Sequence, residues 1–179
     1  MKKSIHAFEY AGDICHAMNK GILLTTKHGD SVNTMTIGWG MLGIEWGKPI
    51  FIAFVRQSRF TRELLDKSME FTVNVPYGEL DAKILGFCGT KSGRDVDKIK
   101  EMGLTLEEPT TIKTPGICEL PLTLECKVLY RQDQDLSGIP ADILEKYYPQ
   151  NIDGSAPGRN RDHHIAYYAE IVDAYIIEK

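Results

Sequence analysis

Long apolar runs are missing from this sequence of 179 residues, and its first residues lead us to expect no secretory leader. No apolar run approaches the ~20 residues that a helix needs to cross a bilayer, so we expect no membrane-spanning segment. The amino-terminal stretch starts basic, but His6, Glu9 and Asp13 interrupt it where a signal peptide requires a continuous apolar core. We therefore expect a cytoplasmic protein.

Paired cysteines and an excess of positive charge are missing as well. The four cysteines, Cys15, Cys88, Cys118 and Cys126, contain no C-x-x-C pair, so we expect reduced thiols rather than a disulfide framework or a metal site. Lysine and arginine number 21 and aspartate and glutamate 25, a net charge of −4 that argues against a nucleic-acid partner. The composition that is present, 42% hydrophobic and 26% charged, is typical of one globular domain, which we expect to span residues 1–179.

Short apolar segments rich in β-branched and aromatic residues, each bounded by turn formers, predict a mainly β fold. The predicted strands cover residues 21–26, 34–39, 50–55, 71–75, 122–130 and 165–177. Helical spacing of apolar residues is found at 9–18, 61–66, 79–87, 95–102 and 141–148. Residues 27–30 contain Gly29 and predict a hairpin turn between the first two strands. The pattern indicates one mostly antiparallel β domain with peripheral helices.

The stretch from Gly38 to Gly43 satisfies the letters of the dinucleotide-binding pattern G-x-G-x-x-G. That pattern needs a helix after its third glycine, because the helix amino terminus faces the pyrophosphate. Here another β-like run follows Lys48-Pro49 instead. We interpret the glycines as thin positions in a strand, required for close packing or for a ligand edge.

Two segments concentrate the donors that bind an anion. The first, residues 56–61, lies between a predicted strand and a helix and offers hydroxyls, free backbone N–H groups and arginine charge. The second, residues 92–98, runs into another predicted helix, where Gly93 lets the backbone approach closely beside two cations. Each segment alone is more often a helix cap with solvated charges. Two of them in a net-acidic protein indicate a phosphorylated ligand.

An ordered set of motifs covers the chain from about residue 21 to residue 172. As they stand here, these are Asn33-Thr-Met-Thr-Ile-Gly-Trp39, Lys48-Pro49, Arg56-x-Ser-Arg-x-Thr61, Phe71-x-Val-Asn-Val-Pro76, Cys88-Gly-x-x-Ser-Gly-Arg-Asp-x-Asp-Lys98 and His164-x-x-Tyr-x-Ala-Glu-Ile171. Their order and spacing resemble the flavin reductase-like, FMN-binding split-barrel family, and most closely its flavoredoxin-type branch. The resemblance implies a six-stranded antiparallel split β-barrel with peripheral helices that forms a homodimer and binds FMN near the subunit interface.

The resemblance also implies which residues meet the flavin. Along the isoalloxazine ring, largely through backbone groups, it places Asn33, Thr34, Met35 and Thr36. At the phosphate and ribityl chain it places Arg56, Ser58, Arg59 and Thr61. A second flavin-contacting loop contains Cys88, Ser92, Gly93, Arg94 and Lys98. The hydride or electron chemistry belongs to the flavin, so no amino-acid nucleophile or general base is assigned.

Four further residues fit two interpretations each. His164 matches a family position on the nicotinamide side of the flavin, although a hydrogen-bonded structural histidine is the default interpretation. Cys88 fits a contact with the flavin or a small buried thiol used for packing. Trp39 and Trp46 fit stacking on a flavin or packing in the core or a dimer interface.

The leading hypothesis is an FMN-dependent oxidoreductase that passes reducing equivalents from NADH or NADPH through flavin to an acceptor. A flavoredoxin-like electron carrier without its own nicotinamide site, passing electrons to a partner protein, is the alternative. A third hypothesis is a split-barrel protein that binds haem or another phosphorylated ligand and catalyses nothing. Residues 147–148 and the turn-rich loop 151–161 are candidates to cover the flavin.

Overall fold

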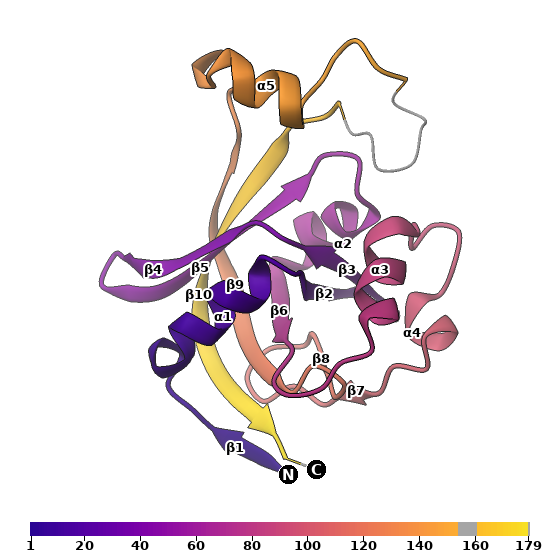
Figure 1. The fold of residues 1–179 in the computed structure, drawn as a ribbon. Coiled ribbons are helices and arrows are strands. Elements are labelled where there is room, and N and C mark those ends of the chain that lie inside the picture. Colours follow the sequence, from indigo (N-terminus) through magenta and orange to yellow (C-terminus); the bar gives the residue numbers. More distant parts are fainter. Residues whose placement is uncertain (154–160, 179) are drawn as a thin grey trace.

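A strongly curved antiparallel sheet organises the computed structural model, which describes residues 1–153 and 161–178 (Figure 1). Within these residues the sheet has eight strands, in the order β3-β2-β6-β9-β10-β5-β4 with β1 paired to β10. The strands are β1 (Lys2–Ser4), β2 (Ile22–His28), β3 (Ser31–Ile37), β4 (Gly40–Glu45), β5 (Lys48–Arg56), β6 (Glu70–Val75), β9 (Leu122–Asp133) and β10 (His164–Ile177). A separate pair is formed by β7 (Leu106–Glu107) and β8 (Gly116–Ile117). The path ends at β3 and β4, so the curled sheet is open between them.

The mainly β prediction is confirmed, and its six strands are found as β2, β3, β5, β6, β9 and β10 with shifted ends. The expected strand number is wrong by two, because the sheet also contains β1 and β4. The three residues of β1 include two lysines, and β4 contains two glycines, so neither has the β-branched composition that marks a strand. The strand predicted at 34–39 ends at Ile37, which leaves Trp39 in the link to β4.

The two longest strands, β9 and β10, form the spine of the sheet. The register between them shifts at Tyr168/Ala169 and again between Ile171 and Asp173. Such irregularities bend a strand pair and increase its twist. The pair therefore follows the curve of the sheet and then extends past its edge, where it carries the segment that connects the two strands (Figure 1).

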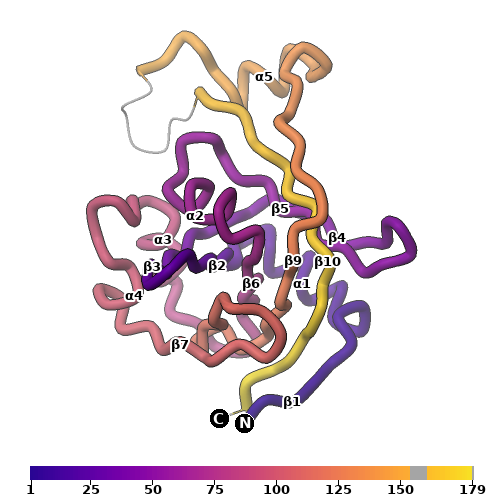
Figure 2. Tube along the Cα trace, turned by 180° about the vertical axis from the view of Figure 1, so that it is seen from behind, coloured from indigo at the N-terminus to yellow at the C-terminus, as the bar shows by residue number. Residues whose placement is uncertain are grey.

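Short helices cover the sheet and its upper end. They are the 3-10 turn η1 (Ala7–Tyr10), α1 (Ala11–Met18), α2 (Phe60–Ser68), α3 (Ala82–Thr90), α4 (Lys98–Glu101), the 3-10 turn η2 (Leu136–Gly138) and α5 (Ala141–Tyr147). Helix α2 packs on β2 and α3 on β3, whereas α5 stands beyond the far ends of β9 and β10. Both termini lie side by side at the opposite end (Figure 2). No helix of the described residues is long and apolar enough to span a membrane.

The helix predicted at 95–102 is shorter than expected. It begins after Asp97, whose carboxylate accepts the Lys100 backbone N–H at 3.1 Å. Because this carboxylate is the N-cap, the preceding residues stay in a loop instead of entering the helix. Of the loop predicted at 151–161, residues 154–160 lie outside the described residues.

Two apolar clusters hold these layers together. The larger one fills the inside of the curved sheet and contains Phe51, Phe71 and Tyr167, all fully buried. The smaller one lies beneath α3 and α4 and includes Leu23 and Cys88. Burial of such side chains stabilises each cluster by about 1.5–3 kcal/mol per large residue. The second cluster fixes the loop between α3 and α4 against the outside of the sheet.

The glycine pattern at 38–43 forms a strand, as the sequence predicts. A Cβ added to Gly40 would lie 2.9 Å from Phe51 Cζ and 3.0 Å from the Ile52 carbonyl oxygen. Gly43, in the same strand, has nothing within 4 Å. Close packing against β5 therefore accounts for the first glycine of β4 and not for the second.

We expect Gly40→Ala to lower the free energy of unfolding by about 1–3 kcal/mol, because the added methyl group overlaps a buried ring and a backbone oxygen. Gly43→Ala is the matched control and is expected to leave stability unchanged or to raise it slightly. Urea unfolding followed by tryptophan fluorescence measures both. Equal stability of the two variants would contradict the close packing inferred at Gly40.

Candidate flavin and substrate sites

Two loops that are distant in the sequence meet around one small cavity, which we call the anion cavity. One loop connects β5 to α2 and the other connects α3 to α4. The cavity has a volume of about 110 Å³. Its lining comprises Asn33, Met35, Ser58, Arg59, Phe60, Thr61, Lys91, Ser92, Gly93, Arg94 and Lys98. The two anion-binding segments indicated by the sequence are thus neighbours in space.

The two loops touch at a glycine. A Cβ added to Gly93 would lie 2.1 Å from Asn33 Oδ1 and 2.8 Å from Phe60 Cδ1, so no other residue fits without displacing them. Asn33 is buried, and its side-chain amide donates to the Thr61 hydroxyl at 2.7 Å. This bond joins β3 to the first turn of α2. The cavity wall is therefore continuous from the edge strand to both loops.

Positive charge dominates the anion cavity. Four of its lining residues are cations, namely Arg59, Lys91, Arg94 and Lys98. Arg94 donates to the Ser58 carbonyl at 3.2 Å and also pairs with Glu63 at the rim. That arginine holds the pKa of the exposed Glu63 carboxyl below its usual value.

Arg59 has an unmatched donor beside this cavity. Its guanidinium donates from Nη1 to the Gly89 carbonyl at 3.3 Å. Its Nε is buried and has no hydrogen-bond partner among the described residues. A buried donor without a partner costs about 1–3 kcal/mol, and an anion in the cavity is the kind of group that would remove this cost.

Lys98 is the most deeply buried cation, with 5% of its surface exposed. Its ammonium donates to the Thr34 carbonyl at 2.9 Å and to the Cys88 carbonyl at 2.8 Å. Burial is the main reason that its pKa falls from 10.5 to about 8. An ammonium has three N–H donors, so one remains after these two bonds. Lys98 thus joins β3 to α3 and still keeps a donor and a charge next to the cavity.

Several residues that the sequence predicts at the flavin lie outside the anion cavity. The hydroxyls of Thr34 and Thr36 are used within the fold, since Thr34 bonds to Thr25 at 3.0 Å and Thr36 to the Leu85 carbonyl at 2.7 Å. The Cys88 side chain packs in the smaller apolar cluster, and burial raises the pKa of its thiol. The side chains of these three residues are thus occupied within the fold, and the Thr34 and Cys88 carbonyls already accept from Lys98.

Arg56 points away from the anion cavity toward the segment that connects β9 and β10. It donates to the Asp162 carbonyl at 2.6 Å and to the Tyr147 carbonyl at 2.9 Å. Its guanidinium lies 5.2 Å from the centre of the Tyr148 ring. The Ser58 backbone N–H contacts the same segment, because it donates to the Asp162 carboxylate at 2.8 Å. Arg56 thus fastens this segment to the end of β5.

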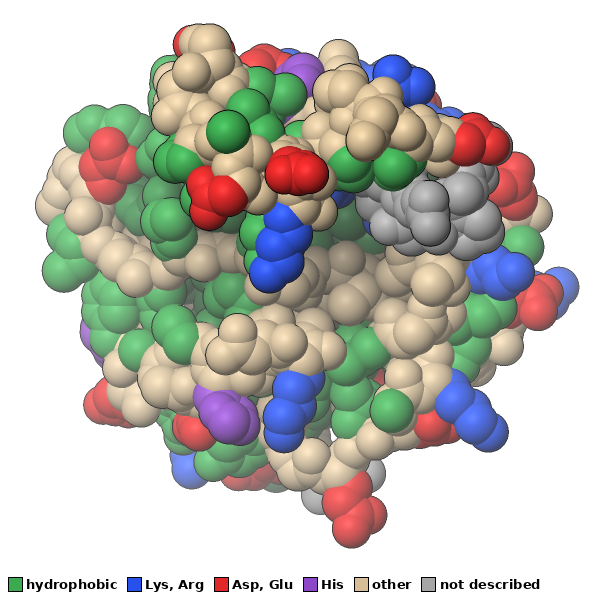
Figure 3. All heavy atoms as spheres, turned by 45° about the horizontal axis from the view of Figure 1, so that its top comes forward, with side chains coloured by type: hydrophobic (Ala, Val, Ile, Leu, Met, Phe, Trp, Pro, Cys, Tyr) green, Lys and Arg blue, Asp and Glu red, His purple; other side chains and the backbone are tan. Residues whose placement is uncertain are grey.

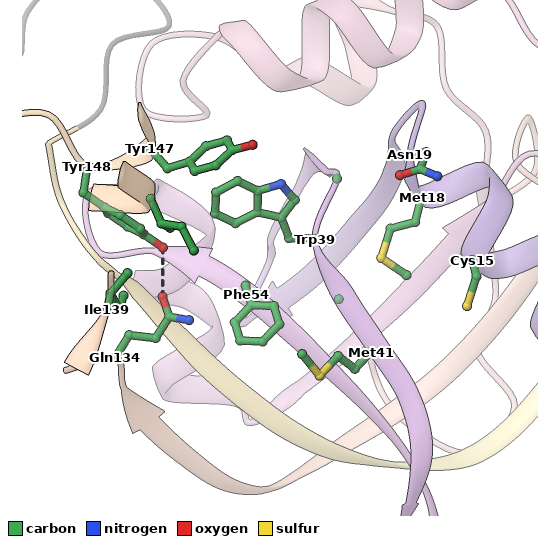
Figure 4. Close-up of a pocket in the computed structure, with 13 residues that line it drawn as sticks. Cys15, Met18, Asn19, Trp39, Met41, Phe54, Gln134, Ile139, Tyr147 and Tyr148 are labelled. Carbon is green, nitrogen blue, oxygen red and sulfur yellow. Dashed lines mark hydrogen bonds between the residues drawn. The ribbon is translucent and has the colours of Figure 1, made fainter. Parts of the chain in front are cut away.

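His164 belongs to a buried network near a second cavity, which we call the aromatic cavity (Figure 4). Its Nδ1 lies 2.8 Å from the Tyr148 hydroxyl, which also bonds to Gln134 Oε1 at 3.0 Å. The His164 ring centre is 4.7 Å from that of Trp39. Burial, reinforced by the Arg56 charge, lowers the pKa of His164 from 6.5 to about 4. The imidazole is therefore neutral near pH 7.

The aromatic cavity has a volume of about 540 Å³. It is lined by Cys15, Met18, Asn19, Gly38, Trp39, Gly40, Met41, Phe54, Gln134, Ile139, Ile143, Tyr147 and Tyr148. Of these, the sequence singles out Trp39, the tyrosine pair and the glycines of the 38–43 pattern without placing them at a cavity. Nothing in the local sequence around Gln134, Ile139 and Phe54 indicates a binding site. They become neighbours only because the chain that follows β9 lies near β5. No cluster of three or more His, Cys, Asp or Glu side chains that could hold a metal occurs among the described residues.

Comparison with known proteins identifies the family to which this chain belongs. Residues 16–179 match the model of the flavin reductase like domain. The chain belongs to the flavin reductase-like family. An uncharacterized protein of Pyrococcus abyssi is 32% identical over 113 residues, which is 62% of this chain and 62% of that relative, so the match spans less than two thirds of the relative's length.

Solved members of the family share the fold. The flavoredoxin of Methanosarcina acetivorans superimposes with a TM-score of 0.63 and 25% identity over 88% of this chain and 68% of that one. The NADH:FAD oxidoreductase of Streptomyces globisporus C-1027 gives a TM-score of 0.60 and 15% identity over 88% of this chain and 75% of that one. The split-barrel class and the flavoredoxin-like resemblance inferred from the motifs are thereby confirmed.

The buried His164 makes stability depend on pH. In the unfolded chain an imidazole with an ordinary pKa of 6.5 takes up a proton on acidification, whereas the folded state does so only near pH 4. The contribution of the neutral His164 to the free energy of unfolding is therefore fully present above pH 6.5. It is lost as the pH falls toward 4. We expect the free energy of unfolding to drop by about 3 kcal/mol more between pH 7 and pH 4 in the wild type than in His164→Gln. Urea titrations at the two pH values test this, and parallel losses in both proteins would refute it.

Proposed function

We propose that this chain binds FMN and passes reducing equivalents from NADH or NADPH through it to an acceptor. The observation that carries the proposal is the anion cavity, where two loops, four cations and Gly93 converge. Membership of the flavin reductase-like family gives the cavity its context. The first turn of α2 adds backbone donors and a helix dipole, which favour a phosphate group.

The residues present fit the phosphate end of FMN. Arg59 and Lys98 both line a hollow whose volume, about 110 Å³, suits a phosphate and excludes a tricyclic ring. The ring would then lie outside this cavity, against β3. This strand is an end of the sheet path, with β2 as its neighbour in the described residues, so its other side has backbone groups outside the strand pairing, of which the Thr34 carbonyl accepts from Lys98.

Lys98 would hold a proton at this site. A phosphate next to its ammonium favours the charged form and raises the pKa above about 8. Because the same ammonium holds the Thr34 carbonyl, it also orients the strand that meets the ring. FMN supplies the hydride and electron transfer when it is bound. Asn33, Gly93 and Lys98 bind and orient it.

The second candidate is an electron carrier without a nicotinamide site. The likeness to the flavoredoxin of Methanosarcina acetivorans favours it, since this structure has the higher identity of the two described above. The two candidates differ in the electron donor. An enzyme oxidises NADH or NADPH directly, whereas a carrier accepts electrons from a partner protein and leaves both nicotinamides unchanged.

A homodimer is part of the proposal. The hairpin of β4 and β5 projects from the sheet and exposes Met41, Ile44 and Trp46 at 57%, 74% and 56%. Figure 3 shows hydrophobic side chains gathered on the side toward which this hairpin points, at the left of the view. Exposed apolar groups of this size mark surfaces that bury against another protein. Light scattering coupled to size-exclusion chromatography tests the dimer, and a monomer at micromolar concentration would contradict it.

The FMN site is tested by Arg94→Gln. We expect it to weaken FMN binding by about 1–3 kcal/mol, because it removes one of the four cations that line the anion cavity and would attract the phosphate. Arg62→Gln is the matched control, since Arg62 also pairs with a carboxylate, Asp66, but does not line the anion cavity. Quenching of FMN fluorescence on titration with protein measures the affinity. Equal affinities of the two variants and the wild type would remove the phosphate assignment.

The same preparation distinguishes the candidate functions. Oxidation of NADH or NADPH by the FMN-loaded protein, followed by loss of nicotinamide absorbance, supports the enzyme. Photoreduced protein that passes electrons to a carrier protein but ignores both nicotinamides supports the carrier. Absence of FMN binding overturns both and leaves a protein that binds some other phosphorylated ligand.

A further inference from the structure

An ion pair lies at the outer boundary of the anion cavity. Arg94, on the loop between α3 and α4, pairs with Glu63 in the first turn of α2. Arg94 lines the cavity, whereas Glu63 does not. The two side chains are partly exposed, Arg94 by 44% and Glu63 by 40%. The pair therefore lies between the cavity and solvent.

Three contacts hold the Arg94 guanidinium at this boundary. It donates to the Ser58 carbonyl at 3.2 Å, it pairs with Glu63, and its central carbon lies 5.5 Å from the centre of the Phe60 ring. All three partners belong to the segment that runs from β5 into α2, whereas Arg94 belongs to the other loop. The arginine thus joins the two loops that form the cavity. We call these three contacts the Arg94 link.

The Arg94 link depends most on the Glu63 carboxylate. Glu63 is the charged partner among the three, and a hydrogen bond between opposite charges is stronger than a bond to a neutral acceptor. Arg94 holds the pKa of the Glu63 carboxyl below its usual value, so this carboxylate is ionised near pH 7. A guanidinium has five N–H donors, and the bonds to Ser58 and Glu63 leave donors for an anion in the cavity.

The neighbouring part of the wall is closed by direct packing. At Gly93, next to Arg94, an added Cβ would lie 2.1 Å from Asn33 Oδ1, so the loop touches β3 there. The volume of about 110 Å³ suits one phosphate group, and a second phosphate joined to the first has to lie outside it. A molecule that continues beyond its phosphate therefore has to pass the outer boundary, where the Arg94 link closes the way.

We propose that the Arg94 link makes the anion cavity select a terminal phosphate monoester over a phosphate that continues into a longer chain, and that Glu63 is the residue that determines this specificity. The inference rests on the proposed function and narrows its ligand. FMN ends in a monoester, which fits inside the cavity and leaves the Arg94 link intact. FAD carries a pyrophosphate that continues to adenosine, so it has to separate Arg94 from Glu63 in order to bind.

Calorimetric titration of the flavin-free protein with FMN and with FAD measures the selection. We expect the wild type to bind FMN at least about tenfold more tightly than FAD, because FAD binding breaks charge-assisted contacts. In Glu63→Ala we expect this ratio to fall at least about threefold, on the scale of an exposed ion pair. The FMN phosphate and the FAD pyrophosphate carry similar negative charge near pH 7. Loss of the Glu63 charge by itself therefore raises both affinities alike and leaves their ratio unchanged.

Glu101→Ala is the matched control. Glu101 is an exposed carboxylate on α4, the helix that follows the same loop, and it does not line the cavity. We expect this variant to keep the wild-type ratio of FMN to FAD affinity.

Arg94→Gln provides a second variant that removes the Arg94 link. We expect its affinity for FMN to fall and its affinity for FAD to fall less, because the lost cation attracts both flavins whereas the lost link opposes only FAD. Calorimetry with the same two flavins measures this difference.

Several results would overturn the inference. These are a wild-type ratio clearly below tenfold, a fall in Glu63→Ala smaller than threefold, an equal fall in Glu101→Ala, or equal losses of FMN and FAD affinity in Arg94→Gln. Tight binding of FMN together with equally tight binding of FAD refutes the selection and leaves the proposed function standing. If the wild type binds neither flavin, the proposed function fails and the inference fails with it. The two failures are thus distinguishable.

Discussion

The buried ammonium of Lys98 is the contact on which the arrangement of the candidate site depends. It reaches the Thr34 carbonyl on the edge strand and the Cys88 carbonyl in α3, two segments that no strand pairing connects. Without it, the loop between α3 and α4 would be tied to the sheet mainly by the smaller apolar cluster. The contact is expensive, because burial pulls the pKa of this lysine to about 8. A buried cation whose cost is offset by two carbonyls also makes the adjoining cavity receptive to an anion.

The close approach of the second loop to β3 explains why a glycine occupies the point where the two loops meet. Lys98 holds the second loop close to β3, and at that distance the Asn33 amide leaves no room for a side chain on residue 93. Asn33 in turn positions Thr61 in the first turn of α2. A chain of contacts therefore runs from α4 through β3 to α2. Each of its members occurs in a motif that the sequence displays, although their order in space is set by packing.

Much of the fold follows from local sequence. β-branched runs bounded by turn formers predict six strands because burial on a curved sheet selects those residues. The prediction misses β4, since two glycines weaken its signal, although the close approach of Gly40 to Phe51 is the reason that the strand fits. The anion cavity was foreseeable because cations, hydroxyls and a glycine recur in two loops. The direction of Arg56 was not foreseeable, because it depends on carbonyls of Tyr147 and Asp162 that are distant in the sequence.

The aromatic cavity has a different origin from the anion cavity. One wall is the segment from Gln134 to Tyr148, which Arg56 links to the end of β5 and the Tyr148–His164 bond links to the start of β10. The anion cavity, in contrast, is formed by the sheet edge and two loops that pack directly on it. A connection of this kind tolerates changes in length and composition better than the sheet does. In the proposed function the phosphate therefore lies on the sheet and the loops packed on it, not on this connection.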